Sequence, residues 1–283
     1  MGKKPKISAG RKNSPSPGNS CCVLILLLYT SLLFSQQRDS SARLRTLRTV
    51  SEVFALSKVE ASQAYPVELD AIVLYSDPEW GALFVQDRTG PTFIDTHGIG
   101  KKYSAGTWVR VQAVTGTNEN GPTLAHPKIT VLGRGEVPRP VPTSVAELDG
   151  GANESRLGFT EGRLRPCERD YFRVCFRLFD GRKAIWLFVP QPESPASQGL
   201  IGAVVRARGV ISRHADEKNP SQRVGAQLYL NRLEDIQVIE PPAAVGFGSP
   251  PLPIHELRAS EADERFVRQI HLRGTVTWQS PGL

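Results

Sequence analysis

The segment Gly106-Thr-Trp-Val-Arg-Val-Gln-Ala-Val114 returns later in the chain as Gly202-Ala-Val-Val-Arg-Ala-Arg-Gly-Val210. In both copies apolar residues alternate with polar or small ones, the period of a β-strand with one buried face. A short opening motif also returns, because Val53-Phe-Ala-Leu56 is matched by Val145-Ala-Glu-Leu148 and by Ile254-His-Glu-Leu257. Successive copies lie about 100 residues apart, the length of a small domain. The sequence therefore predicts a repeated β-domain.

Period-two alternation predicts five short strands in each of two units. In the first strand, for example, Val67, Leu69 and Ala71 share one face. The predicted strands are 67–75, 81–86, 93–94, 108–114 and 129–132 in the first unit, and 159–165, 171–179, 184–189, 204–211 and 236–239 in the second. A three-strand meander, a connection and two further strands are typical of the OB fold, a five-stranded, partly open Greek-key barrel. The expected fold class is all-β, with tandem five-stranded OB-like barrels after an N-terminal signal or anchor helix.

Shifts in composition set the expected domain boundaries. Proline-rich segments, such as 137–142, are typical of semi-rigid spacers between domains. We expect a signal peptide or signal anchor at 1–34, a linker at 35–50, OB-like domains at 51–138 and 143–241, and the start of a truncated third OB-like unit at 252–283. The first domain should open with a short helix over 51–63, capped by Ser51. The connections between strands three and four should be loops, at 96–106 and 190–202.

The positive charge of the chain is concentrated at its N-terminus. The formal net charge is +7, but residues 1–50 hold nine of the 35 Lys and Arg and one of the 28 acids, which leaves 26 bases against 27 acids beyond them. A protein that binds nucleic acid by releasing phosphate counterions needs its positive charge on the folded surface. We therefore expect no nucleic-acid partner.

An uncharged apolar run, Cys21 to Phe34, follows the first five bases. This order is typical of an export signal, and the run is shorter than the ~20 residues of a relaxed membrane-spanning helix. Ser35 suits a cleavage site but Leu33 does not, so an uncleaved signal anchor remains an alternative; a buried core helix is disfavoured by the polar flanks. The protein is expected in the periplasm or another extracytoplasmic space, either free or anchored in the inner membrane through 21–34.

Two cysteines flank the predicted first hairpin of the second unit. Cys167 and Cys175 lie eight residues apart in the sequence, on the polar faces of adjoining predicted strands. In an oxidising compartment such a pair can form a disulfide across the hairpin. Two free thiols are the alternative.

Ligands of OB barrels usually meet the face of strands two and three and the loops that join strands one to two and four to five. In the first unit these loops are 76–80 and 115–126, and in the second 166–170 and 213–224. The candidate ligand-binding residues are Asp77, Glu79, Trp80, Asn118, Asn120 and Tyr171. An aromatic ring beside two carboxylates can stack on a sugar or another planar group. Alternatively, Trp80 covers the end of the barrel and Asp77 caps the turn.

Several arginines of the second unit should align on outward faces of neighbouring strands: Arg163, Arg165, Arg173, Arg177, Arg206 and Arg208. They could form an anion-binding stripe, for which aromatic platforms beside the charges are expected. Acids are interleaved with them, so a self-neutralising solvated face is the favoured interpretation. Trp186 is expected in the core, and Trp108 on the less buried face of its strand.

No pattern indicates catalysis or a cofactor. The five histidines do not stand at metal-ligand spacing from a Cys or acid partner, and no serine occupies an elbow motif. Glycine-rich fragments such as 98–101 lack the strand-loop-helix context of a phosphate loop. We expect a protein that is not an enzyme, with no metal and no cofactor.

The first unit contains Tyr65-Pro-Val-Glu-Leu69 and Tyr75-Ser-Asp-Pro-Glu-Trp-Gly-Ala-Leu-Phe-Val-Gln-Asp87. These segments resemble the extracytoplasmic sensor regions of certain bacterial membrane sensor histidine kinases, whose tandem OB-like units carry the pattern D-P-E-W-G-x-L-F-V-Q-D. The resemblance covers residues 50–283. It implies a ligand-binding role upstream of signalling and does not transfer catalysis, because the kinase part is absent from this sequence.

The function expected from these observations is that of an exported, membrane-associated sensory module that binds a small molecule, a glycan or a protein. The alternative is an exported carbohydrate-binding or structural OB-fold protein with no role in signalling.

Overall fold

The computed structural model describes residues 44–167, 173–215, 223–242 and 275. The described residues from Arg45 onward belong to one compact unit. The predicted signal or anchor at 1–34, Tyr171 and nearly all of the predicted third unit lie outside the described residues. Among the residues that the structure does describe, no helix is both long and apolar enough to span a membrane.

Two short helices, α2 (Val50–Phe54) and α3 (Lys58–Ala61), precede the first sheet. The prediction of one helix over 51–63, capped by Ser51, is wrong. Thr49 caps α2 and Ser57 caps α3, and in each the glutamate three residues later accepts a hydrogen bond from the capping residue's own N–H. A second capping box inside the predicted helix starts a new helix there.

The opening motif is repeated in the structure, but with a shifted register. Helix α4 (Val145–Asp149) is capped by Ser144 with Glu147, in the same way as α2. Segment 49–53 is therefore the structural equivalent of 144–148, and each helix buries two apolar residues against its barrel.

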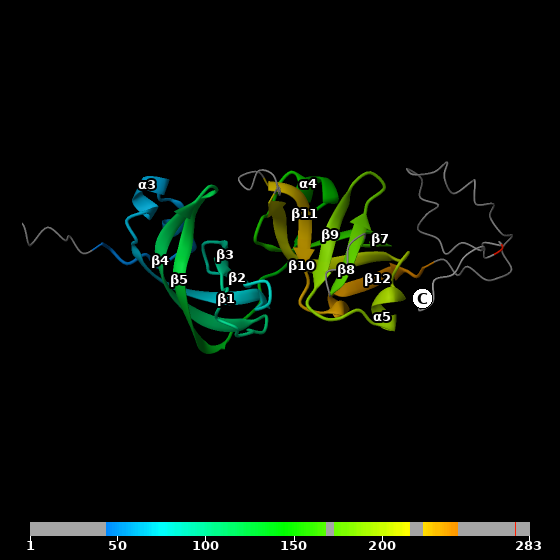
Figure 1. Ribbon diagram of the computed structural model, residues 1–283, viewed down its shortest axis with the longest axis horizontal. Helices are drawn as coiled ribbons and strands as arrows, with labels where there is room; N and C mark the ends of the chain where they lie inside the picture. Colours follow the sequence, from blue (N-terminus) through cyan, green and yellow to red (C-terminus); the bar gives the residue numbers. More distant parts are fainter. Residues whose placement is uncertain (1–43, 168–172, 216–222, 243–274, 276–283) are drawn as a thin grey trace, which may run out of the picture. The chain divides into compact units, whose positions relative to one another are not determined.

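The first sheet has the strand order β3-β2-β1-β4-β5. Its strands are β1 (Pro66–Asp77), β2 (Ala82–Gln86), β3 (Pro91–Asp95), β4 (Thr107–Asn118) and β5 (Gly121–Arg134). After the β1–β3 meander the chain returns to place β4 beside β1, the Greek-key connection of an OB barrel. No ladder joins β3 to β5 among the described residues, so this barrel stays open along one seam (Figure 1).

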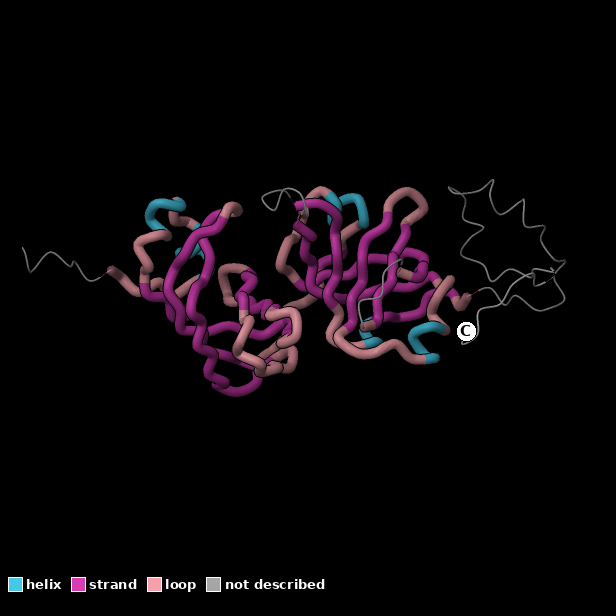
Figure 2. The backbone as a smooth tube through the Cα atoms, viewed as in Figure 1, coloured by secondary structure: helices cyan, strands magenta, loops and turns pink. Residues whose placement is uncertain are grey.

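The second sheet closes completely. Its barrel strands are β7 (Leu157–Pro166), β8 (Val174–Phe179), β9 (Ala184–Val189), β10 (Val204–Ala215) and β11 (Arg223–Tyr229). They pair in the circuit β7-β8-β9-β11-β10-β7, with β9 and β11 parallel and the other pairs antiparallel. The remaining elements of this half are short: β6 (Val141–Pro142), α5 (Pro195–Gln198), η1 (Leu233–Asp235) and β12 (Ile236–Glu240). The fold is all-β with two tandem OB-like barrels, as predicted (Figure 2).

The prediction of the fifth strand of the second barrel is wrong. The barrel is completed by β11, whereas the predicted segment, 236–239, lies in β12, which pairs only with β10. Leu228 of β11 is fully buried, while Val238 and Ile239 of β12 are 42% and 46% exposed. β12 contributes only its first residue, Ile236, to the core, whereas β11 contributes alternate residues such as Ala226 and Leu228.

Each barrel has its own hydrophobic core, formed by the inward side of the alternating strands. The first core includes Leu69, Val73, Leu83, Ile94, Val109 and Val111. The second includes Leu164, Phe176, Leu178, Ile185, Leu187, Val205 and Leu228. The connection between strands three and four of the second barrel, predicted as a loop, contains the one-turn helix α5.

Replacing Leu228 by Ala should lower the free energy of unfolding by about 2–5 kcal/mol, because the change leaves a cavity in a closed core. The matched change Val238→Ala, on the strand outside the barrel, should cost no more than about 0.5 kcal/mol. Urea unfolding of both variants, followed by circular dichroism, measures the difference. Equal losses would contradict the assignment of β11 as the closing strand.

Candidate functional site

The loop between β1 and β2 is organised by the buried carboxylate of Asp77. Its Oδ1 accepts the backbone N–H groups of Glu79 and Trp80 at 3.1 and 3.4 Å, and its Oδ2 accepts the Tyr75 hydroxyl at 3.1 Å. Burial, followed by the negative charge of Asp77, raises the pKa of Tyr75, so the phenol stays a donor. Asp77 thus caps the turn, as the alternative interpretation of this loop predicts.

The same loop holds an arginine of the second barrel. Arg173 donates from Nη1 to Asp77 Oδ2 and from Nη2 to Glu79 Oε2, the latter at 2.9 Å. Its guanidinium lies 3.8 Å from the centre of the Trp80 ring. The side chains of Arg173 and Asp77 are 4% and 2% exposed. We call this group of four residues (Asp77, Glu79, Trp80 and Arg173) the junction.

Aromatic rings of both barrels pack around the junction. Trp80 meets Phe188 edge-on with the ring centres 5.0 Å apart, and Tyr75 stacks on Tyr229 at 5.1 Å. The apolar cluster beneath them contains Leu74, Ala82, Phe84, Leu157 and Val210. Such pairs stabilise a contact beyond the area that they bury. Three of the candidate ligand residues therefore contact the second barrel through Arg173.

The loop that carries Arg173 is closed by a disulfide between Cys167 and Cys175, whose Cα atoms are 5.6 Å apart. Cys175 is buried on β8, and Arg173 lies two residues before it. Tyr171, the remaining candidate of this loop, lies outside the described residues. The cross-link therefore ties the segment that carries the junction arginine to the end of β7.

A groove of about 1050 Å³ lies beside the open seam of the first barrel. Its walls come from β3, the segment that follows it and the β4–β5 hairpin, with Phe54 of α2 and residues 154–155 before β7 completing the lining. The apolar lining includes Phe54, Phe93 and Ile99, which are 48%, 46% and 36% exposed. Strand three and the loop between strands four and five are the usual ligand-binding elements of OB barrels.

Asn118 and Asn120, the other two candidates, both line this groove. Asn118 Oδ1 accepts the backbone N–H of Asn120 at 2.8 Å, which fixes the tip of the hairpin. The strands on either side are longer than predicted, so the loop expected at 115–126 is reduced to a tight turn. The two residues thus line the groove from the turn of the hairpin.

The groove also contains a carboxylate beside an imidazole. His97 Nδ1 lies 2.7 Å from Asp95 Oδ1, which also accepts the backbone N–H of His97 at 2.9 Å. Burial pushes the pKa of Asp95 upward, but these two hydrogen bonds and the charge of His97 outweigh burial and hold it below its ordinary value. The His97 ring packs against Gly81, which has a positive φ of 57° and directly follows Trp80 of the junction.

The charged groups of the groove lining, apart from its histidines, are acidic. Asp95 and Glu154 line it, and no Lys or Arg does among the described residues. A groove of aromatic rings, amides and carboxylates suits a neutral or basic ligand better than a polyanion.

Most of the arginines predicted to form a stripe on the second barrel have individual partners; Arg208 is the exception among the described residues. Arg165 lies over Phe179 at 3.7 Å, Arg177 lies over Trp186 at 4.3 Å, and Arg206 pairs with Glu161 on the neighbouring strand. Arg163 donates to the carbonyl of Gly202 at 2.8 Å. Of these contacts, only the Arg206–Glu161 pair is the charge neutralisation favoured from the sequence, while Arg165 and Arg177 lie on aromatic rings, the feature expected of the anion-binding alternative.

Two tryptophan positions follow from strand alternation. Trp108 is 42% exposed, as expected. The prediction of a core position for Trp186 is wrong: Ile185 and Leu187 face inward, so Trp186 faces outward, where Arg177 covers it. Adjacent residues of one strand cannot share the core face.

Sequence reasoning missed Arg173 as a junction residue and Phe54, Phe93 and His97 as groove residues. Phe93 could have been found, because it stands on predicted strand three at a position that alternates with buried residues. Phe54 comes from a helix that precedes the barrel, and no sequence pattern places it at the seam. Within the described residues no cluster of His, Cys, Asp and Glu could hold a metal ion.

No protein-family model matches the sequence, and no curated protein matches it. Among solved structures, a murine DNA-binding protein bound to double-stranded DNA is 12% identical with a TM-score of 0.31, covering 63% of this chain and 98% of its own. The Ifi202 HINa domain in complex with 20-bp double-stranded DNA is 9% identical with a TM-score of 0.31, covering 63% and 97%.

The aspartyl-tRNA synthetase of Entamoeba histolytica is 14% identical with a TM-score of 0.27, covering 50% of this chain and 30% of its own. The chain spans less than a third of the aspartyl-tRNA synthetases that it matches. At these scores the similarities assign no function to this chain.

Replacing Arg173 by Gln should lower the free energy of unfolding by about 3–5 kcal/mol, because it leaves the buried carboxylate of Asp77 without its cation. The matched control is Arg110→Gln, which breaks an exposed pair with Asp70 and should cost far less. Chemical denaturation monitored by tryptophan fluorescence measures both. A loss for Arg173→Gln no larger than for the control would contradict a stabilising junction.

Proposed function

We propose that this chain is the ligand-binding, sensory part of an exported signal-transduction protein, non-catalytic by itself, and that it captures its ligand in the groove of the first barrel. The observation that carries the proposal is the groove, which lies where OB barrels commonly bind their ligands. It lies beside the open seam of the first barrel, whereas the equivalent seam of the second barrel is closed by the pairing of β9 with β11. The sensory role rests on the resemblance of 65–69 and 75–87 to sensor regions of membrane histidine kinases.

The lining favours a neutral polar ligand, such as a glycan or an extended uncharged peptide segment. Exposed Phe54 and Phe93 offer flat apolar surfaces, and Asn118 and Asn120 offer donors and acceptors at one end. Nucleic acid is disfavoured at this site, because its charged lining repels phosphates and lacks the cations that would release counterions.

An exported carbohydrate-binding protein without a signalling role is the second candidate, and the same aromatic and amide lining favours it. The sensory protein and the carbohydrate-binding protein differ in what the full gene encodes. A coding sequence that continues beyond Leu283 into a membrane span and a kinase core would support sensing. An unrelated gene directly downstream would favour the carbohydrate-binding protein.

The groove itself is tested by screening the full chain against neutral oligosaccharides and uncharged peptides with thermal-shift assays, followed by titration calorimetry of the hits. Phe93→Ala should weaken a true groove ligand by about tenfold or more, the equivalent of 1.4 kcal/mol of lost contact. Val131→Ala is the matched control, since Val131 is similarly exposed at 47% but does not line the groove. Affinity should also fall in Asn120→Ala.

If the hits bind Phe93→Ala and Asn120→Ala as tightly as they bind the unchanged protein, the groove is not the binding site. A single-stranded oligonucleotide that binds tightly with a steep salt dependence would contradict the proposed ligand class.

A further inference from the structure

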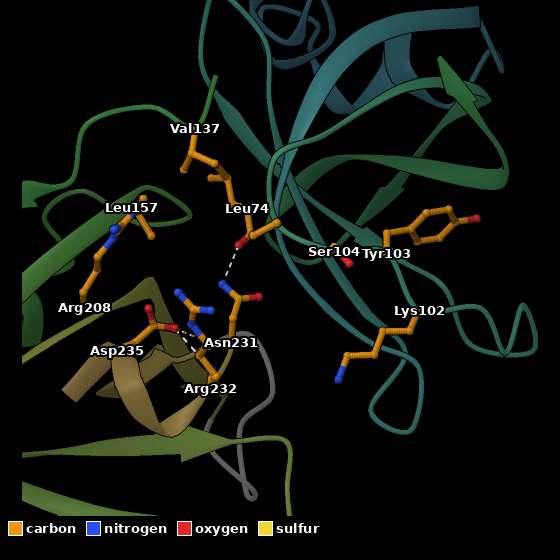
Figure 3. A pocket seen from close by; sticks show the side chains of 11 residues that line it. Leu74, Lys102, Tyr103, Ser104, Val137, Leu157, Arg208, Asn231, Arg232 and Asp235 are labelled. Carbon is orange, nitrogen blue, oxygen red and sulfur yellow. Dashed lines mark hydrogen bonds between the residues drawn. The ribbon is translucent and has the colours of Figure 1, made fainter. Parts of the chain in front are cut away.

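A second cavity, of about 380 Å³, lies apart from the groove (Figure 3). Its first-barrel wall is formed by Leu74, the segment 102–105 and Val137, and its second-barrel wall by Leu157, Arg208 and residues from the turn before η1. Both walls belong to the compact unit that begins at Arg45. We call it the cationic pocket.

Three cations line the cationic pocket. Lys102 comes from the first barrel, and Arg208 and Arg232 come from the second. Within the part of the chain that the structure describes, none of the three side chains has an ion pair or hydrogen bond from its charged group, in contrast to Arg163, Arg173 and Arg206. Lys101 adds a fourth positive charge nearby, held 5.3 Å from the centre of the Tyr103 ring.

Asp235 is the one carboxylate in this lining among the described residues. Its Oδ2 accepts the backbone N–H groups of Asn231 and Arg232 at 3.1 and 3.2 Å, which fixes the turn before η1. Burial raises its pKa, although those hydrogen bonds and the charges of Arg232 and Arg208 oppose the shift. The described lining of the pocket therefore holds three cationic side chains and one carboxylate, and that carboxylate already accepts two backbone hydrogen bonds.

Much of the remaining wall is apolar and well packed. Leu74, Val137 and Leu157 belong to the cluster that packs beneath the junction, and Tyr103 is nearly buried. The Asn231 amide donates to the carbonyl of Leu74 at 2.9 Å, which ties the turn to β1 of the first barrel (Figure 3). The pocket thus combines positively charged side chains with packed apolar ones.

We propose that the cationic pocket binds a small organic phosphomonoester, with its phosphate held by Arg208 and Arg232 of the second barrel and its organic part against the apolar side chains, while Lys102 adds positive charge from the opposite wall. A phosphomonoester carries about −1.5 to −2 charges at pH 7, which three cations and one carboxylate complement. Arginine and lysine are the usual phosphate ligands of proteins. The volume falls within the range of small-molecule sites. No described residue lines both the pocket and the groove.

The probe is adenosine 5′-monophosphate, titrated into the full chain by calorimetry at constant ionic strength, with adenosine and inorganic phosphate as comparison ligands. We expect saturable binding of the nucleotide, weaker binding of phosphate and none of adenosine. Arg208→Gln and Arg232→Gln should each weaken nucleotide binding by about tenfold or more, and Lys102→Gln, on the opposite wall, should weaken it less. Asp235→Asn should strengthen it.

The matched control is Arg206→Gln. Arg206 is exposed on the same strand, two residues before Arg208 and on the same face, but it pairs with Glu161 outside the pocket. Thermal unfolding of each variant without ligand checks that it folds, and the substitutions of the exposed Lys102, Arg206 and Arg208 should leave the midpoint almost unchanged. The proposal is overturned if the nucleotide does not bind, if Arg206→Gln weakens it as much as Arg208→Gln, or if adenosine or inorganic phosphate binds as tightly as the nucleotide.

Discussion

The buried contact between Arg173 and Asp77 constrains the rest of the molecule. Both side chains have lost water, and neither can be left alone in the apolar surroundings that Trp80 and its neighbours provide. Asp77 is already fixed by the turn that it caps, so it holds the guanidinium in one place. The loop between the first two strands of one barrel therefore meets the corresponding loop of the other.

This contact decides which surfaces remain for ligands. An OB barrel usually offers its first loop, strands two and three and the loop between strands four and five. In the first barrel the first loop is occupied by Arg173, which leaves β3 and the β4–β5 hairpin, the elements that line the groove. The second barrel is closed by the parallel pairing of β9 and β11, so the two repeats are no longer equivalent and the open one carries the groove.

The features that could be predicted from the sequence are those that depend on neighbouring residues. Alternation predicts Ala184–Val189 as a strand with the observed bounds, and it predicts Phe176 and Leu178 in the core, where they lie. It fails where the outcome depends on residues far apart in the chain. Nothing local distinguishes β11 from β12, since both can pair with β10 and only packing in the barrel selects one. Arg173 meets Asp77 across 96 residues, so its stacking on Trp80 could not be derived from either segment alone.

The junction also gives a physical route between the candidate sites. Phe93 of the groove lies 5.3 Å from Phe84, which packs toward Tyr229 of the second barrel, and Leu74 of the cationic pocket packs in the same cluster. A ligand that binds only when the side chains of the two barrels are in contact stabilises that contact by mass action. Coupling between two binding sites is reciprocal, so a ligand in the groove changes the affinity of the cationic pocket for its own ligand, and the reverse, only if it shifts this shared contact. Any coupling between the groove and the pocket should therefore disappear when Arg173 is replaced, even though Arg173 lines neither cavity.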